Sequence, residues 1–304
     1  MVIGDKNYIY STQVRNNDIL RNSFNALVKK TFGFSFEEWY NSGGWGDMYI
    51  PHVLLDGDKV VSNVSVNIMQ FDICGERKNY IQLGTVMTDS SYRGMGLNRY
   101  IMENILQEYI NKTDGIYLFA NDSVLNYYPK FGFMASKEYE YYMPCTGIDD
   151  IKPYVIEKTD MSKEHQRRQF YNVIADCPNN TGDLNQNDGM YMDKNLGLYH
   201  FWIEAGFGDS IYFIPENGTY IAADVQGKIL HIHQVFGKEY IELKRLVKPF
   251  GGGAEEILAG YVPACKDGFQ AREHKEEDST LFILGESLHC IENDKMMFPV
   301  LSHA

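Results

Sequence analysis

The chain has few features of a secreted or membrane-embedded protein. Its five cysteines are odd in number and never stand in a CxxC spacing, which predicts reduced thiols and argues against a disulfide framework or a cysteine zinc site. No apolar run approaches the roughly 20 residues of a membrane helix, and the N-terminus MVIGDKNYIYS lacks the basic-then-apolar order of a signal peptide. We therefore expect a cytoplasmic protein with no membrane partner. The cysteines are Cys74, Cys145, Cys177, Cys265 and Cys290.

An excess of positive charge is also absent. The formal net charge is −13, from 28 Lys and Arg against 41 Asp and Glu, which argues against a nucleic-acid partner because phosphate contacts need a basic face. Residues 1–145 hold 13 basic against 16 acidic residues, and the remainder holds 15 against 25. The acidic second half favours solubility, and it is also compatible with attraction of a cationic substrate.

The composition is that of a globular protein, with 44% hydrophobic and 14% aromatic residues, and 304 residues suffice for two domains of about 150 each. Residues 144–153 resemble a linker, so we expect domains at 1–145 and 146–304. The second half repeats the first in outline: helix, strand meander, helix, strand. The patterns predict helices at 18–30 (capped by Asp18), 35–40, 97–109, 123–130, 161–175 and 238–247, and strands at 49–55, 59–70, 80–88, 115–120, 133–143, 210–215, 219–225, 228–236, 254–262, 280–284 and 295–300.

One stretch, TVMTDSSYRGMGLNRYIM at residues 85–102, carries a chemical signal. A strand leads into Arg93-Gly94-Met95-Gly96 and then into an amphipathic helix. Unpaired N–H groups at a helix N-terminus favour an anion, and glycines let phosphate oxygens approach the backbone. The lysine and the magnesium-binding hydroxyl of a P-loop are missing, which disfavours phosphoryl transfer. A diphosphate that serves as a handle fits better, and this indicates coenzyme A.

These residues resemble the GCN5-related N-acetyltransferase (GNAT) superfamily, whose loop reads Arg/Gln-x-x-Gly-x-Gly/Ala. Asn98 departs from that pattern at its last position. Downstream, NDSVLNYYPKFGF resembles the superfamily's Asn-x-x-Ala-x-x-x-Tyr-x-Lys-x-Gly-Phe, with Asn121 and Tyr128 in register. The resemblance implies an α/β fold with a mixed sheet: a GNAT domain over 1–145 and a second, degenerate GNAT-like domain. The layout is similar to tandem GNAT proteins of the enhanced-intracellular-survival type without their sterol-carrier domain.

The resemblance also implies roles for particular residues, with acetyl-CoA as co-substrate. Tyr128 would protonate the departing CoA thiolate, and Asn121 would contact the pantetheine arm. Trp39, Tyr40 and Trp45, beside a glycine-rich loop, are candidates for the acceptor site, and the segment ending at Ala304 is a candidate source of the base. The strand Val86, Met87 and Thr88 would pair with pantetheine, and the pyrophosphate would lie at Arg93, Gly94, Met95, Gly96, Leu97 and Asn98.

Two other motifs have plainer readings. His231-Ile232-His233 places two imidazoles on one strand face, but no acidic or cysteine ligand accompanies them at a suitable spacing, so we expect no metal. Gly251-Gly252-Gly253 reads as a turn. The leading hypothesis is an acetyl-CoA-dependent N-acetyltransferase that acts by direct attack on a primary amine, small or peptidic and expected to be cationic. The alternatives are a non-catalytic acyl-CoA-binding regulator and a tRNA-dependent aminoacyl transferase.

Overall fold

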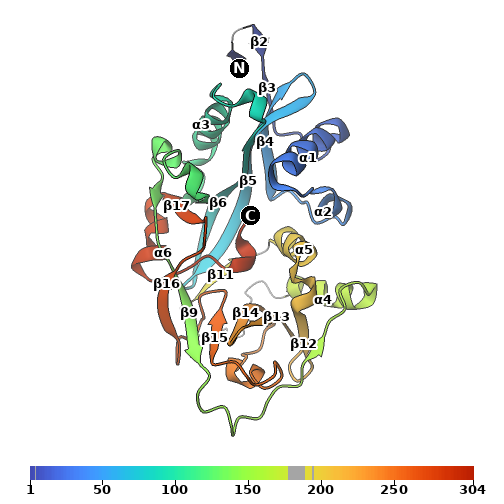
Figure 1. The fold of residues 1–304 in the computed structure, drawn as a ribbon, viewed down its shortest axis with the longest axis vertical. Helices are drawn as coiled ribbons and strands as arrows, with labels where there is room; N and C mark the ends of the chain where they lie inside the picture. The colour runs from blue at the N-terminus through green and yellow to red at the C-terminus, as the bar shows by residue number, and fades with distance from the viewer. Residues whose placement is uncertain (4, 177–188, 194) are drawn as a thin grey trace.

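The chain folds around two mixed β-sheets, one above the other in Figure 1. The computed structural model describes residues 1–3, 5–176, 189–193 and 195–304. Four of the cysteines are free thiols, and Cys177 lies outside the described residues. Among the described helices, none combines the length and apolar character needed to cross a bilayer. The helices are α1 (Asp18–Phe32), α2 (Glu37–Asn41), α3 (Leu97–Tyr109), α4 (Glu164–Asp176), α5 (Leu196–Ala205) and α6 (Cys290–Asn293).

The first sheet holds most of the strands predicted from the N-terminal half, together with strands from the C-terminal half. The predicted strand at 133–143 is wrong as one element, because it is split between a short strand of this sheet and a strand of the second sheet. Helices α1 and α3 cover its opposite faces, because each buries an apolar stripe against it (Figure 1). A short hairpin, β1 (Val2–Ile3) and β2 (Lys6–Asn7), stands apart. The strand order is β3 (Ile9–Ser11), β4 (Tyr49–Asp56), β5 (Lys59–Ile73), β6 (Glu76–Thr88), β7 (Gly115–Ala120), β17 (Thr280–Leu284) and β8 (Met134–Ala135), and β11 (Met190–Asp193) pairs with the end of β5.

The second sheet repeats the connectivity of the first. In each sheet an antiparallel meander is followed by a parallel pair, which is β6 with β7 in the first and β14 with β15 in the second. The predicted mixed α/β fold with a second GNAT-like half is confirmed by this arrangement. The strand order is β10 (Glu157–Lys158), β12 (Ile211–Ile214), β13 (Thr219–Gln226), β14 (Ile229–Phe236), β15 (Glu256–Ala259), β9 (Glu138–Pro144) and β16 (Gln270–His274).

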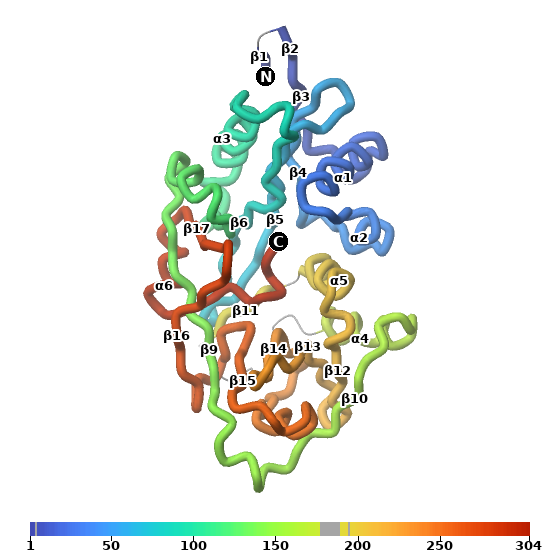
Figure 2. The backbone as a smooth tube through the Cα atoms, in the orientation of Figure 1, coloured from blue at the N-terminus to red at the C-terminus, as the bar shows by residue number. Residues whose placement is uncertain are grey.

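The two halves exchange strands. In the first sheet β17 lies between β7 and β8, and in the second sheet β9 lies between β15 and β16. Figure 2 shows the red β17 among strands of the N-terminal half and the green β9 running down into the lower half. Sheet membership therefore does not change at residue 145, where the sequence pattern placed the boundary.

Several local predictions differ from the structure. The cap of α1 is Asn17, whose Oδ1 accepts hydrogen bonds from the N–H groups of Ile19 and Leu20, and not Asp18. Residues 238–247 form no α-helix and hold only a 3₁₀ turn at Leu243–Leu246. Residues 295–300 form no strand, and residues 123–130 form two short 3₁₀ turns in place of a helix.

One irregularity in β6 opens the sheet. Its parallel ladder with β7 ends at Leu83, paired with Leu118, so the remainder of β6 diverges from β7. Thr85 has φ 48°, a left-handed conformation that β-branched residues rarely adopt, and the register with β5 shifts beside it. Its Oγ1 lies 2.9 Å from the Tyr49 hydroxyl, and its carbonyl accepts a hydrogen bond from Asn63 Nδ2 at 2.7 Å. These contacts hold the bulge in place.

Candidate active site

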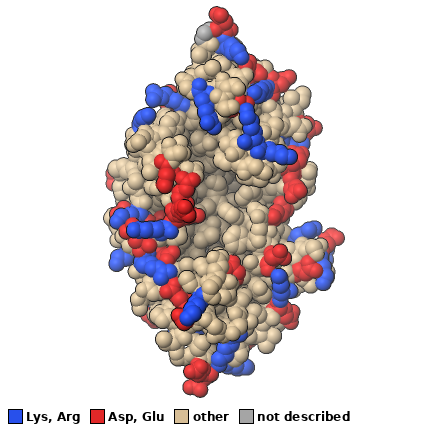
Figure 3. Space-filling view, viewed as in Figure 1, with Lys and Arg blue, Asp and Glu red and all other residues tan. Residues whose placement is uncertain are grey.

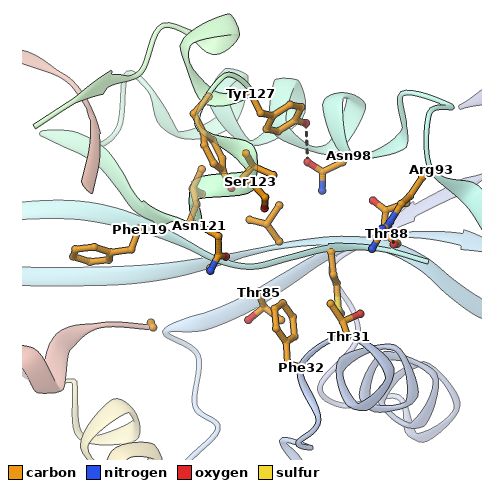
Figure 4. A pocket seen from close by; sticks show the side chains of 17 residues that line it. Thr31, Phe32, Thr85, Thr88, Arg93, Asn98, Phe119, Asn121, Ser123 and Tyr127 are labelled. Atoms are coloured by element: carbon orange, nitrogen blue, oxygen red, sulfur yellow. Dashed lines mark hydrogen bonds between the residues drawn. The ribbon is translucent and has the colours of Figure 1, made fainter. Parts of the chain in front are cut away.

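The divergence of β6 from β7 produces a cleft of about 610 Å³. In Figure 4, Tyr127, Asn98 and Arg93 lie on one side of this cleft, and Thr31 and Phe32 of α1 lie on the other. Figure 3 shows a hollow in the same face of the molecule, with Lys and Arg side chains above it and acidic side chains on both sides. The lining residues are Thr31, Phe32, Leu83, Gly84, Thr85, Val86, Met87, Thr88, Arg93, Asn98, Phe119, Asn121, Ser123, Val124, Tyr127, Tyr128 and Ala304.

The arginine–glycine loop lies at one end of the cleft. Gly94 and Gly96 both have φ 77°, and no atom lies within 4 Å of a Cβ built on either, so the loop leaves room for a ligand against its backbone. The Arg93 Nε donates to the Thr88 carbonyl at 3.3 Å, which fixes the turn between β6 and α3. A second hollow of about 540 Å³ surrounds the loop and shares Thr88, Arg93, Asn98 and Tyr127 with the cleft.

Asn98, where the superfamily pattern has glycine or alanine, connects three segments at the start of α3. Its Nδ2 donates to the Asn63 carbonyl of β5 at 3.3 Å, and its Oδ1 accepts from the Tyr127 hydroxyl at 2.8 Å (Figure 4). The larger side chain therefore ties the segment that carries Tyr127 and Tyr128 to the helix and the sheet. No sequence pattern signalled this contact.

Tyr128 is the buried member of the tyrosine pair. Its side chain is 4% exposed, and its ring packs against Phe282 at 5.6 Å and Phe133 at 6.2 Å. Burial raises the pKa of Tyr128 to about 12, with a smaller contribution from Tyr127. Across the described residues, no hydrogen bond of the Tyr128 hydroxyl is found. The hydroxyl is thus protonated at neutral pH and lies in a residue that lines the cleft.

Asn121 lies in the cleft wall but its amide is engaged by the C-terminal half. Its Nδ2 donates to the Asp278 carboxylate at 2.9 Å and to the Asp278 carbonyl at 3.3 Å. The same carboxylate accepts from the Asp122 N–H at 2.7 Å. The loop before β17 therefore shapes this wall, a contribution that no local pattern indicated.

A second, smaller pocket adjoins the cleft on the α1–α2 side of the sheet. We call it the aromatic pocket: it has a volume of about 180 Å³ and is lined by Phe32, Phe34, Phe36, Trp39, Tyr49, Asn67, Thr85, Leu198, Phe201 and Ala304. Three of these residues, Phe32, Thr85 and Ala304, also line the cleft. The two cavities therefore meet at these residues.

Only one of the three predicted acceptor-site aromatics lines this pocket. Trp39 does, and its Nε1 donates to the Gly197 carbonyl of α5 at 2.7 Å. Trp45 is 4% exposed and packs behind Trp39, with its Nε1 donating to the Tyr49 carbonyl at 3.1 Å. Tyr40 lies against the Arg21 guanidinium, whose carbon is 3.7 Å from the ring centroid. Trp45 and Tyr40 line neither the cleft nor the aromatic pocket, because they serve the α1–α2 core.

The segment ending at Ala304 reaches the point where β6 and β7 diverge. The Gln82 Nε2 donates to the Ala304 carbonyl at 3.4 Å, and a Cβ built on Gly84 would lie 2.5 Å from that oxygen. The Trp202 Nε1 donates to the His303 carbonyl at 2.8 Å, and the His303 ring stacks on Phe119 at 4.0 Å. Residues of α5 and β7 therefore hold this segment against the cleft.

The paired histidines lie elsewhere, in the second sheet. The His233 Nε2 and Asp224 Oδ2 are 2.7 Å apart, and the rings of His231 and His233 stack at 5.9 Å. No group of three or more potential metal ligands is found in the part of the chain that the structure describes.

Comparison with known proteins indicates the type of domain in the first half of the chain. A family model described as an acetyltransferase (GNAT) domain matches residues 17–135. No curated protein sequence matches the chain. A solved structure from Enterococcus faecalis V583, titled a conserved protein of unknown function and probable N-acyltransferase, is 15% identical with a TM-score of 0.56, and the match covers 92% of this chain and 71% of that one.

Two further solved structures have the same overall arrangement. A GCN5-related N-acetyltransferase from Kribbella flavida has a TM-score of 0.56 at 12% identity, over 91% of this chain and 71% of that one. Eis1 from Mycobacterium abscessus has a TM-score of 0.53 at 9% identity, over 90% and 72%. At such identities the likeness shows the fold, and the family model adds the type of domain. Residues 17–135 therefore match a GNAT acetyltransferase domain, and the chain as a whole shares its fold with these solved structures.

Proposed function

We propose that the protein transfers the acetyl group of acetyl-CoA to a primary amine by direct attack, with Tyr128 assisting the departure of the thiolate. The observation that carries the proposal is one continuous cavity system. It runs from the arginine–glycine loop, along the diverging part of β6, to Tyr128 and the aromatic pocket. A long, bent ligand with an anionic handle and a reactive far end fits this system.

The residues of the cleft fit coenzyme A from one end to the other. The N–H groups of Arg93 to Asn98 would hold the pyrophosphate, because the left-handed glycines leave open space there and α3 presents its N-terminus. Val86, Met87 and Thr88 lie beyond the end of the β6–β7 ladder, so their backbone groups are available to the pantetheine arm as to an added strand. Asn121 would shape the opposite wall through its bond to Asp278.

The chemistry then requires two proton movements. The amine nitrogen forms a bond to the thioester carbonyl carbon, the carbon–sulfur bond breaks with its electron pair on sulfur, and the proton that the amine loses passes to water. Tyr128 would direct its hydroxyl at the leaving sulfur, because it lines the cleft and keeps its proton at neutral pH. Thr85 and Ala304, where the two cavities meet, and Asn67 of the aromatic pocket would surround the amine.

The domain division belongs to the same proposal. The half from residue 146 onward would form part of the acceptor site, since Leu198, Phe201 and Ala304 line the aromatic pocket. It would bind no CoA, because no arginine–glycine loop lies between β14 and β15, the parallel pair of its sheet.

The test is a panel of primary amines incubated with acetyl-CoA, with free thiol release as the readout and reactions lacking amine as the control. We expect amine-dependent thiol release and an acetylated product detected by mass spectrometry. Tight acetyl-CoA binding by calorimetry without release by any amine would favour the alternative of a non-catalytic acyl-CoA-binding protein.

A further inference from the structure

The aromatic pocket is built from two distant parts of the chain. One part is the end of α1, its connection to α2 and α2 itself, which supply Phe32, Phe34, Phe36 and Trp39; the other part is α5, which supplies Leu198 and Phe201. The Trp39 bond to the Gly197 carbonyl joins these parts. The pocket therefore exists only when both halves of the chain are folded together.

The walls of the pocket are braced by ring contacts. Phe36 lies 5.6 Å from Phe201 and 5.2 Å from Tyr49, and Phe34 lies 5.0 Å from Phe36. Phe36, Trp39 and Tyr49 are at most 6% exposed, whereas Phe34 is 41% exposed. The base is thus fixed within the core, and Phe34 stands at the mouth.

The size of the pocket suits one ring. A cavity of about 150 Å³ lined by apolar side chains accommodates benzene, and the aromatic pocket has about 180 Å³. No Asp, Glu, Lys or Arg is among its described lining residues. A cationic group without an apolar body would leave these apolar walls uncovered, whereas an apolar ring would gain from leaving water.

The polar groups where the two cavities meet indicate that the aromatic pocket holds part of the amine and not an acyl chain. Asn67, Thr85 and Ala304 supply polar groups at one side of the pocket, and Thr85 and Ala304 are shared with the cleft. An acyl chain extending from the thioester would have to pass these polar groups with methylenes, which cannot form hydrogen bonds. An amine nitrogen at the junction, with its apolar group beyond it, satisfies both the polar junction and the apolar walls.

We infer that the acceptor is a primary amine that bears one ring-sized aromatic group on a short linker, and that this ring occupies the aromatic pocket. The inference rests on the proposed function and narrows its substrate class. It adds an aromatic group to the expected cationic amine, because no Asp, Glu, Lys or Arg is found among the described residues that line the pocket.

The experiment compares three primary amines with the full chain and acetyl-CoA: 2-phenylethylamine, ethylamine and 1,4-diaminobutane. Burial of a phenyl-sized group stabilises by about 1.5–3 kcal/mol, so kcat/KM for 2-phenylethylamine should exceed that for ethylamine by roughly tenfold to a hundredfold. Phe34→Ala should raise KM for 2-phenylethylamine by roughly twofold to tenfold, since one aromatic contact is worth roughly 0.5–1.5 kcal/mol. The ratio of kcat/KM for 2-phenylethylamine to kcat/KM for ethylamine should fall with it. Tyr240→Ala, an exposed aromatic that lines neither cavity, is the matched control.

Preference for ethylamine or 1,4-diaminobutane, or an equal effect of Phe34→Ala on all three amines, would overturn the inference while leaving acetyl transfer intact. A preference for octanoyl-CoA over acetyl-CoA that disappears in Phe34→Ala would assign the pocket to the acyl chain and would also overturn it. If no amine is acetylated, the proposed function fails. Calorimetry of 2-phenylethylamine with the CoA-loaded protein then decides: binding that Phe34→Ala abolishes supports the pocket assignment, and absence of binding refutes it.

Discussion

Replacing Tyr128 by phenylalanine removes one hydroxyl from the cleft and leaves the ring in place. The ring packs against Phe133 and Phe282, and no hydrogen bond to the hydroxyl is found in the described part of the chain. The substitution therefore costs little folding stability. Any loss of activity then reports on the contact between this hydroxyl and the substrate.

The magnitude follows from the buried position of the hydroxyl. Burial raises the pKa of Tyr128 to about 12, whereas a free thiol has a pKa of about 8.5. Complete proton transfer from this phenol to such a thiolate is uphill by about 5 kcal/mol, so the hydroxyl acts mainly as a hydrogen-bond donor to the charge that develops on sulfur. A hydrogen bond to a charged group is worth about 1.5–3 kcal/mol. We therefore expect Tyr128→Phe to lower kcat by roughly 10- to 150-fold.

The assay is steady-state thiol release between pH 6 and pH 10, with Tyr127→Phe as the matched control. Acetyl-CoA affinity measured by calorimetry should be nearly unchanged in Tyr128→Phe. Because the pKa of Tyr128 lies near 12, this residue should cause no fall in kcat up to pH 10. A wild-type kcat in Tyr128→Phe would refute the role of the hydroxyl. An alkaline fall in the wild type near pH 8–9 that Tyr128→Phe abolishes would refute the argument from burial.

Three further outcomes test the loop, the fold and the pocket. Arg93→Ala combined with Gly96→Val should abolish acetyl-CoA binding in calorimetry, because valine is strained at φ 77°; undiminished affinity in a folded double variant would contradict the loop assignment. Burial raises the pKa of Glu138 to about 7, so the folded protein holds an extra proton between the ordinary value of 4.5 and 7, and stability falls as the pH rises through that window. Glu138→Gln should abolish this dependence and gain on the order of 3 kcal/mol at pH 8 in denaturant unfolding, and an unchanged pH profile would refute it. The KM for 2-phenylethylamine should change less than about twofold between 0.1 M and 1 M salt, since no Asp, Glu, Lys or Arg is found among the described residues that line the aromatic pocket; a strong rise would favour electrostatic attraction.

Local patterns predicted the elements whose stability is local. The strand at Gly115–Ala120 and the helix that follows the arginine–glycine loop were predicted closely, because apolar periodicity and glycine turns mark them within a short window. The predicted strand at 295–300 failed because its backbone has other partners. The Phe298 N–H donates to the buried Glu138 carboxylate, and the Val300 N–H donates to the Gly260 carbonyl. A β-type sequence therefore forms no strand when tertiary contacts satisfy its hydrogen bonds.

The arginine–glycine loop and Tyr128 could be proposed from sequence because their spacing is fixed along the chain, and both line the cleft. The aromatic pocket was missed, although Phe32, Phe34 and Phe36 alternate just before Trp39. Their partner Phe201 comes from α5, and no local pattern indicates which distant ring will complete a pocket. Trp45 was wrongly predicted to line the acceptor site, because the sequence does not distinguish a tryptophan that lines a pocket from one that is buried behind it.

The exchange of strands between the two halves bears on whether residues 1–145 can fold without the rest of the chain. In the whole chain β7 pairs with β17 over five residues, and β9 lies between β15 and β16. A fragment of residues 1–145 would leave β7 with an open edge and β9 without a partner, and open edges promote association. We expect this fragment to bind hydrophobic dyes, to lack a cooperative melt and to bind no acetyl-CoA. Co-expression with residues 146–304 should remove the dye binding and restore both the cooperative melt and acetyl-CoA binding. A cooperative melt with full acetyl-CoA affinity in the fragment alone would show that β17 is dispensable. In that case the cleft and the aromatic pocket would fold separately. The exchange of strands between the halves predicts instead that the two cavities form in one cooperative step.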